Sequence, residues 1–156
     1  MAGWILQGNR ANIGLEVNYA DRGRGRITQN TNDDGKFAVP TLRNIELTAP
    51  YMHDGRYKTL REVINHYNEG IQDSRNLSWA LRDVPFIRED IQFIDDSLIV
   101  FLGSNGNQQI FNTMNLSSFP IANLGLTEHE KDALEAFLRT LTDVDFIADP
   151  KYSNPF

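Results

Sequence analysis

The stretch from Gly35 to Gly70 constrains the fold more than any other part of the sequence, because it ends in a clear amphipathic helix. Thr59 and Glu62 have the spacing of a capping box, in which each side chain accepts a hydrogen bond from a free backbone N–H at the helix start. Apolar residues then recur at helical spacing, which predicts a buried helix face. They are Leu60, Val63, Ile64 and Tyr67.

The same pattern predicts how the end of this helix is oriented. Tyr67 belongs to the apolar stripe, so its side chain is expected on the buried face. His66 is rotated by about 100° from its neighbour on an α-helix, so its side chain is expected to face water. Gly70 is expected to end the helix in the left-handed conformation that glycine adopts without strain.

The first half of the stretch predicts a different structure. Pro40 and Pro50 disfavour a helical conformation in the residue before each of them, and no sustained helical stripe lies between them. We therefore expect an extended or loosely turned segment over residues 41–48, followed by a tight turn at His53-Asp54-Gly55. Backbone carbonyls exposed in such a segment suit a hard cation or the polar edge of a flat cofactor.

A second helix is predicted near the end of the chain. Thr127 and Glu130 form another capping box, and the apolar residues that follow keep helical spacing. They are Leu134, Phe137, Leu138 and Leu141, and they predict a helix over residues 128–141.

The region from residue 84 to residue 120 contains the strongest hairpin signal. Asn105 and Gly106 form a turn dipeptide between two apolar runs, which predicts a small β-hairpin. Residues 98–102 are equally compatible with the extension of a helix.

Composition and charge argue against several classes of protein. The chain has 156 residues, which fits one domain with an ordinary core. Its formal net charge of −6 argues against a nucleic-acid-binding protein, which would normally present a basic face. No apolar run has the length of a membrane span, and the start of the chain lacks the pattern of a signal peptide.

The segment FAVPTLRNIELTAPYMHDGRYKTLREVINHYNEG resembles the C-terminal haem domain of the bacterial di-haem cytochrome c peroxidase/MauG family. The combination of PTLRN, TAPYMHDG and HYN-x-G carries this resemblance. Further segments also match: Asn12–Leu15, Asp21–Arg24, Leu126–Lys131 and Asp149-Pro150. Together the matching segments cover well over half of the chain.

The resemblance implies a mainly α, cytochrome c-like domain over residues 1–156, with residues 84–120 as an insertion. It implies that the parent protein is a periplasmic oxidoreductase that uses hydrogen peroxide and binds two haem c groups. One haem would carry out peroxide chemistry, and the other would pass or store electrons. The implied partners are an electron-donor protein and an N-terminal haem domain.

The absence of cysteine departs from this family. The family attaches each haem through Cys-x-x-Cys-His, so this chain cannot attach haem covalently. We expect that the chain is truncated at its N-terminus and that the motif lies outside it; a cysteine-free relative is the alternative. In a truncated chain, the helix at 128–141 would lack its natural partner, and its apolar face makes a homodimer a candidate.

The resemblance also implies functional residues. Tyr67 aligns with the distal axial ligand of the second haem, where MauG-like members have tyrosine, whereas periodicity alone favours a core tyrosine. Met52 is a rival thioether ligand, although packing is the preferred interpretation. His53 corresponds to a histidine close to the haem, where it would bond the cofactor or the turn backbone, and the structural role is preferred. Arg43 is a candidate for a buried ion pair or a propionate contact, again with the structural role preferred.

Two further sets of residues have alternative interpretations. Thr48 and Pro50 align with residues whose backbone carbonyls hold calcium between the two haem domains of the family. Three arginines, at positions 22, 24 and 26, suit haem propionates, but a solvated loop is preferred.

A hypothesis of a different class is a haem-free structural or interaction domain that binds calcium. The absent cysteines favour it for this chain alone, so whether the chain is itself an enzyme stays open.

Overall fold

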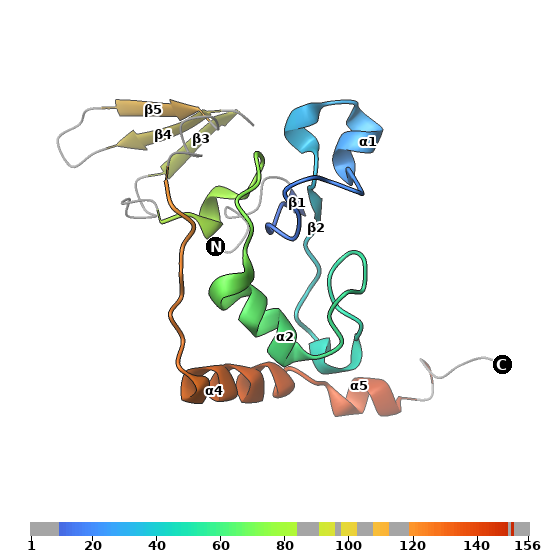
Figure 1. Cartoon of the computed structure of the whole chain (residues 1–156). Coiled ribbons are helices and arrows are strands. Elements are labelled where there is room, and N and C mark those ends of the chain that lie inside the picture. Colours follow the sequence, from blue (N-terminus) through green and yellow to red (C-terminus); the bar gives the residue numbers. More distant parts are fainter. Residues whose placement is uncertain are drawn as a thin grey trace. The chain divides into compact units, whose positions relative to one another are not determined.

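The computed structural model describes residues 10–83, 91–95, 98–102, 108–112, 119–149 and 151, and it combines short helices with short strands (Figure 1). In chain order the elements are β1 (Arg10–Ala11), α1 (Arg24–Thr28), the 3₁₀ helix η3 (Thr31–Asp33), β2 (Phe37–Ala38), the 3₁₀ helix η4 (Ile45–Leu47), α2 (Leu60–Asn65), the π-helical turn η5 (His66–Gly70), the 3₁₀ helix η6 (Trp79–Leu81), β3 (Ile91–Asp95), β4 (Leu98–Leu102), β5 (Gln108–Asn112), α4 (Glu128–Arg139) and α5 (Val144–Ala148). The expectation of a mainly α domain is therefore confirmed only in part.

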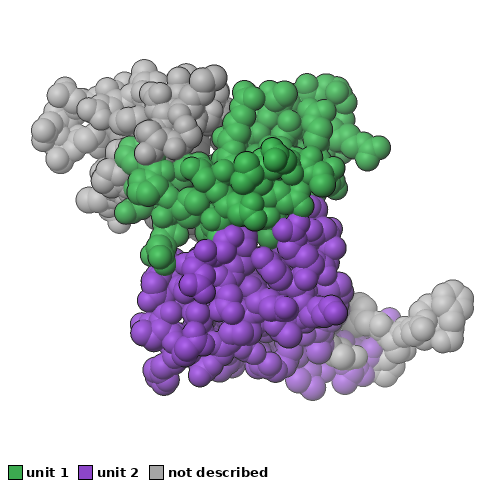
Figure 2. Space-filling model, in the orientation of Figure 1, with its two compact units in different colours: residues 1–39, 71–123 green, residues 40–70, 124–156 purple. Residues whose placement is uncertain are grey.

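The chain divides into two compact units (Figure 2). Unit 1 comprises residues 1–39 and 71–123, and unit 2 comprises residues 40–70 and 124–156. Each unit has its own buried apolar side chains among the described residues. In unit 1 these are Ala11, Leu15 and Leu77; in unit 2 they are Tyr51, Leu60 and Ile64.

The Asn12–Leu15 segment of unit 1 turns around a buried amide. The Oδ1 atom of Asn12 accepts a hydrogen bond from the N–H of Gly14 at 2.9 Å, and its Nδ2 donates to the Oη of Tyr19 at 3.0 Å. Gly14 has a φ of 67°, and a Cβ there would lie 2.7 Å from the carbonyl oxygen of Gln72. Both the conformation and the close approach therefore require glycine.

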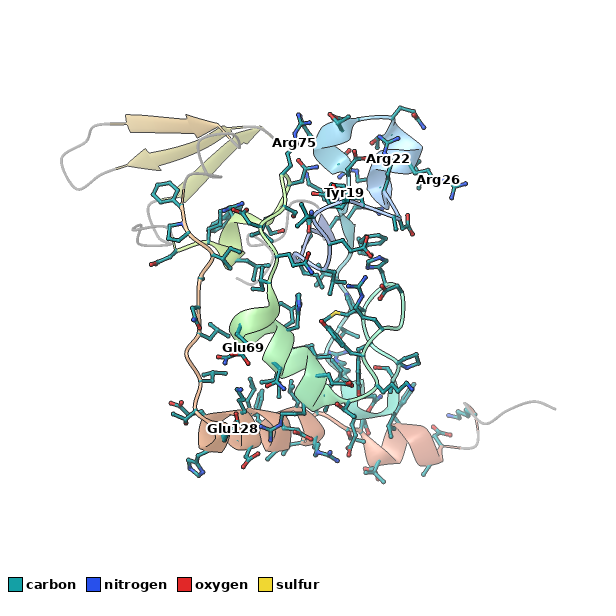
Figure 3. All side chains as sticks on the ribbon, viewed as in Figure 1. Tyr19, Arg22, Arg26, Glu69, Arg75 and Glu128 are labelled. Atoms are coloured by element: carbon teal, nitrogen blue, oxygen red, sulfur yellow. The ribbon has the colours of Figure 1, made fainter. Side chains whose placement is uncertain are left out.

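The arginines of unit 1 correct one expectation from the sequence. Arg22 pairs with Asp34 at 2.8 Å, and Arg24 pairs with Asp33 at 3.3 Å, so these arginines do not form a solvated loop. Acidic residues that follow closely in the chain fold back onto them. Arg26, by contrast, is exposed and points away from α1 (Figure 3).

The hairpin predicted within residues 84–120 is confirmed, but it is part of a larger sheet. Strands β4 and β5 pair antiparallel from Leu98↔Asn112 to Leu102↔Gln108. Strand β3 pairs with the other edge of β4, which gives a three-stranded sheet that the sequence did not predict. The Asn105-Gly106 dipeptide lies outside the described residues.

Both predicted capping boxes are present in unit 2. At the start of α2, the hydroxyl of Thr59 accepts from the N–H of Glu62 at 3.2 Å, and the Glu62 carboxylate accepts from the N–H of Thr59 at 2.8 Å. Thr127 and Glu130 make the equivalent bonds at the start of α4. Helix α4 ends at Arg139, slightly before the predicted end at residue 141.

Ion pairs join α2 and η4 to α4. Arg61 pairs with Glu135 at 3.0 Å, with Glu128 at 3.4 Å and with Asp132. Arg139 pairs with Glu46 at 2.7 Å. One guanidinium thus contacts three carboxylates on successive turns of α4, so it fixes the register between the two helices.

The apolar stripe of α4 is only partly buried, since Leu134 and Leu138 are half-buried and Phe137 is exposed. Phe137 is 57% exposed, and the only buried residue of α4 is Lys131. Val144 and Phe146 of α5 are also exposed. Within the described part of the chain, no helix has the length and apolar character needed to span a membrane.

Candidate cofactor-binding site

The site begins where α2 changes its helical pitch. The α-helix ends at Asn65, and the chain continues as the π-helical turn η5 to Gly70. Such turns are rare in proteins, and those that occur often lie at functional sites. Gly70 has no positive φ, so the expected left-handed end is wrong. Its place next to His66 gives it a different role: a Cβ at Gly70 would lie 3.3 Å from the Nδ1 atom of His66.

His66 is buried, and the expectation that it faces water is wrong. Its exposed fraction is 2%. The apolar stripe of α2 predicted only one packed side of the helix, but the segment that precedes α2 covers the other side. Tyr57 from this segment places its Oη 3.4 Å from the Nδ1 atom of His66, within hydrogen-bond distance.

Three aromatic side chains, Tyr57, His66 and Tyr67, form a cluster that we call the aromatic triad. The centroids of the Tyr57 and His66 rings are 5.8 Å apart with a tilted arrangement. Those of His66 and Tyr67 are 5.4 Å apart, and the two rings meet edge to face at 71°. This is a favourable geometry for aromatic pairs, so His66 lies between the two tyrosines and contacts both.

Tyr67 is half-buried, and this burial raises the pKa of its phenol. A phenol is protonated at neutral pH even in water, and here deprotonation is harder still, because the charged phenolate is poorly solvated. In this form the hydroxyl is a hydrogen-bond donor. To bind a metal as phenolate, it must release its proton.

Asn68 holds the segment before α4 against the π-helical turn. Its Oδ1 accepts a hydrogen bond from the backbone N–H of Leu126 at 2.7 Å, and the residue is only 6% exposed. Helical periodicity does not predict this role for Asn68. The HYN-x-G pattern contains the signal for it, because its four named residues, His66, Tyr67, Asn68 and Gly70, all belong to the turn.

The loop before α2 contains most of the other predicted site residues. The expected turn is present, because the N–H of Gly55 bonds to the carbonyl of Met52 at 3.4 Å. Met52 is half-buried and has a φ of 71°, whereas Thr48, Pro50 and His53 are exposed.

The residues predicted to contact a propionate or a cation are exposed: Arg43, Thr48 and Pro50. Arg43 is exposed, and its backbone N–H bonds to the hydroxyl of Thr41 at 3.3 Å. Over the described ranges, no group of three or more His, Cys, Asp or Glu side chains is placed to hold a metal ion. Calcium binding by the carbonyls of Thr48 and Pro50 stays a prediction.

Comparison with known proteins relates the chain to a group of haem enzymes. No protein-family model matches it. The methylamine utilization protein MauG of Paracoccus denitrificans is 31% identical over 133 residues, which are 83% of this chain and 29% of that protein. Cytochrome-c peroxidase IdrP1 of Pseudomonas sp. (strain SCT) is 35% identical over 82 residues, which are 53% of this chain and 21% of that protein.

A solved structure agrees with these relatives. The crystal structure of a MauG-like protein associated with microbial copper homeostasis is 35% identical to this chain, with a TM-score of 0.59. The match covers 94% of this chain and 38% of that protein. The chain belongs to the di-haem cytochrome c peroxidase/MauG family.

The chain spans only part of a family member. The matches cover between 14% and 29% of the relatives just compared and of a second cytochrome-c peroxidase IdrP1, from Denitromonas iodatirespirans. The chain contains no cysteine, so it supplies neither of the thioether bonds that hold haem c in this family.

The residues of unit 2 match haem in donor type only. A phenol oxygen such as that of Tyr67 is a type of atom that binds haem iron in other proteins, and it loses its proton when it binds as phenolate. Covalent attachment of haem has no counterpart in this chain, because the chain contains no cysteine.

Proposed function

We propose that this chain is part of the C-terminal haem domain of a hydrogen-peroxide-dependent di-haem oxidoreductase. Support comes from relatives named cytochrome-c peroxidase and MauG, and from the MauG-like structural neighbour. The observation that carries the proposal is the position of Tyr67, which lies in the π-helical turn beside a buried His66. Tyr67 is the axial ligand candidate, and bound haem would supply the redox chemistry.

The residues of this chain would hold and orient the iron ligand. Tyr67 would bring its oxygen to the iron and release its phenolic proton, which its raised pKa makes costly without the metal. The ring of His66 packs against Tyr67. Asn68 secures the turn to the segment before α4 through its bond to Leu126. Met52, His53 and Arg43 would contribute secondary contacts from the loops.

Several further parts of the proposal concern the parent protein. Its partners would be hydrogen peroxide, an electron-donor protein and an N-terminal haem domain, and its location would be the periplasm. Calcium would bind between the haem domains with the carbonyls of Thr48 and Pro50 among its ligands. Residues 84–120 would be an insertion relative to most of the family, and the chain alone would not turn over peroxide.

A haem-free structural or interaction domain is the second candidate. The absence of cysteine favours it, since no covalent link to haem is available. The ion pairs of Arg61 and Arg139 also connect α2, η4 and α4 without any cofactor. In this alternative, Tyr67 is a packing residue, and the exposed side chains of α4 and α5, such as Phe137 and Val144, cover a partner or a second copy of the chain.

Titration of the purified chain with haemin separates the two candidates. The proposal predicts a saturable, stoichiometric shift of the Soret absorption band that changes in Tyr67→Phe. The variant Met52→Leu is the matched control, because it removes the rival thioether from the neighbouring loop. A Soret shift that is not saturable would exclude the haem-binding proposal for this chain. A shift that changes in Met52→Leu but not in Tyr67→Phe would show that Met52, and not Tyr67, binds the iron.

A further inference from the structure

We propose that His66 and Tyr57 are positioning residues that fix the ring of Tyr67 before a cofactor binds. The fixation of the ring is a property of the chain alone. Its use in orienting an iron ligand rests on the proposed function. This role would account for the contacts of His66 with both tyrosines, which the amphipathic pattern of α2 does not explain.

The first step is the attachment of His66 to Tyr57. The imidazole is 2% exposed, and its Nδ1 atom lies 3.4 Å from the hydroxyl oxygen of Tyr57. A polar ring that is buried in this way needs hydrogen-bond partners to offset the loss of water. The Tyr57 hydroxyl can supply one, and this contact restricts the rotation of the imidazole about its side-chain bonds.

The second step is the attachment of Tyr57 to the rest of unit 2. The backbone of Tyr57 pairs with that of Tyr51, whose N–H donates to the Tyr57 carbonyl at 2.7 Å. Tyr51 is buried, and its hydroxyl donates to the carbonyl of Ile45 at 2.9 Å. Tyr57 is therefore part of a braced segment, and it can act as a fixed support for His66.

The third step transfers this restraint to Tyr67. The rings of His66 and Tyr67 meet edge to face with centroids 5.4 Å apart, so the fixed imidazole limits the rotamers open to the phenol. Gly70 leaves room for this arrangement, because a Cβ there would approach His66 Nδ1 to 3.3 Å. A ligand held in one rotamer binds with a smaller loss of side-chain entropy.

The test uses nuclear magnetic resonance of the chain without haem, with the Tyr67 signals assigned through Tyr67→Phe. We expect one dominant Tyr67 rotamer in the original chain and ring signals displaced by the neighbouring imidazole. His66→Leu removes the supporting ring, so its Tyr67 side-chain couplings should average between rotamers. His129→Leu is the matched control, since it replaces an exposed histidine of the same unit that has no place in the site, and it should leave the Tyr67 signals unchanged.

A milder variant keeps the test decisive if His66→Leu unfolds. Tyr57→Phe removes only the hydroxyl that faces His66, and it should increase rotamer averaging at Tyr67 in a folded chain. A folded Tyr57→Phe chain with the same Tyr67 couplings and ring shifts as the original would overturn the inference. The same holds for a folded His66→Leu chain with unchanged Tyr67 signals.

Haemin binding then separates this inference from the proposed function. If both are right, Tyr57→Phe should weaken haemin binding by about 2- to 10-fold, the effect expected when one more side chain must be immobilised on binding. Ordered Tyr67 signals without any saturable haemin binding would refute haem binding by this chain and leave the restraint intact. Saturable binding that depends on Tyr67 but is unaffected by both Tyr57→Phe and His66→Leu would refute the positioning role alone.

Discussion

The loop from Thr48 to Gly55 and the turn from His66 to Gly70 both belong to the stretch that resembles the family, but they differ in burial. In the loop, Thr48 and His53 are exposed. In the turn, His66 is 2% exposed and Asn68 is 6% exposed. Family-like sequence therefore corresponds to two kinds of structure in one unit.

This difference shows which parts of the site the chain defines by itself. The residues of the turn have partners on neighbouring segments of unit 2, such as Tyr57 and Leu126. The loop residues implied to contact haem or calcium present mainly solvent-exposed groups. We infer that the side chains of the turn keep their geometry without a cofactor. The loop is anchored through buried Tyr51, but its exposed side chains are less restrained. The predictions below test this contrast.

Removal of core volume next to the turn should have the largest effect. Ile64 is 3% exposed on the helix that leads into the turn, and Ile64→Ala should lower the free energy of unfolding by about 2–5 kcal/mol. Leu47→Ala, at a residue that is 57% exposed near the loop, should have a much smaller effect. Urea denaturation of both variants provides the measurement, and equal losses would remove the contrast.

Loss of the Asn68 bond should have the next largest effect. Asn68→Ala removes the acceptor of the Leu126 N–H, which should lower the free energy of unfolding by about 1–3 kcal/mol. Thr48→Ala in the exposed loop should stay within about 0.5 kcal/mol of the original chain. Thermal and urea unfolding would measure both, and a neutral Asn68→Ala would show that the turn is not secured by this bond.

Much of the local structure was predictable from the sequence, whereas contacts between segments were not. The capping boxes at Thr59 and Thr127 depend on residues three positions apart, so their patterns were sufficient. The burial of His66 depends on Tyr57, which reaches it from outside the helix. Periodicity within one helix has no information about such a neighbour.

The same limit explains the other differences. Strand β3 was not predicted, because only its pairing with β4 identifies it as a strand. The ion pairs of Arg22 and Arg24 also depend on how the chain returns toward them. Within the candidate site, only the resemblance proposes Tyr67 as an iron ligand, whereas its phase on the helix alone indicates a packing residue.

The pH dependence of haemin binding sharpens the contrast through Tyr67. Burial raises the pKa of this phenol, so the group is protonated at neutral pH and must lose a proton to bind iron as phenolate. Affinity should therefore increase with pH, by at most about tenfold per pH unit, until the raised pKa is reached. Absorption titrations across this range should show a smaller pH dependence for Tyr67→Phe, and identical profiles would contradict the assignment.

The ion pair in the loop should have the smallest effect. The Arg56 guanidinium hydrogen-bonds the carboxylate of Asp54 and lowers the pKa of that carboxyl. A lowered pKa in the folded state means that the contribution is present above the ordinary pKa and is lost as the pH falls through the lowered value. Because the pair is partly exposed, Asp54→Asn should cost less than about 1 kcal/mol at neutral pH.

Melting temperatures measured from neutral to acidic pH would check this prediction for Asp54. The difference between the original chain and Asp54→Asn should shrink as the pH falls. A large and constant difference would show that the loop is held more firmly by the chain than its exposure indicates.

Resonance Raman spectroscopy of the chain with bound ferric haem tests the central claim most directly, because it detects which side chain contacts the iron. The account predicts enhanced phenolate vibrations in the original chain and in His53→Leu, and their loss in Tyr67→Phe. A haem complex without phenolate vibrations, or one whose phenolate vibrations persist in Tyr67→Phe, would contradict the claim that the π-helical turn carries the iron ligand.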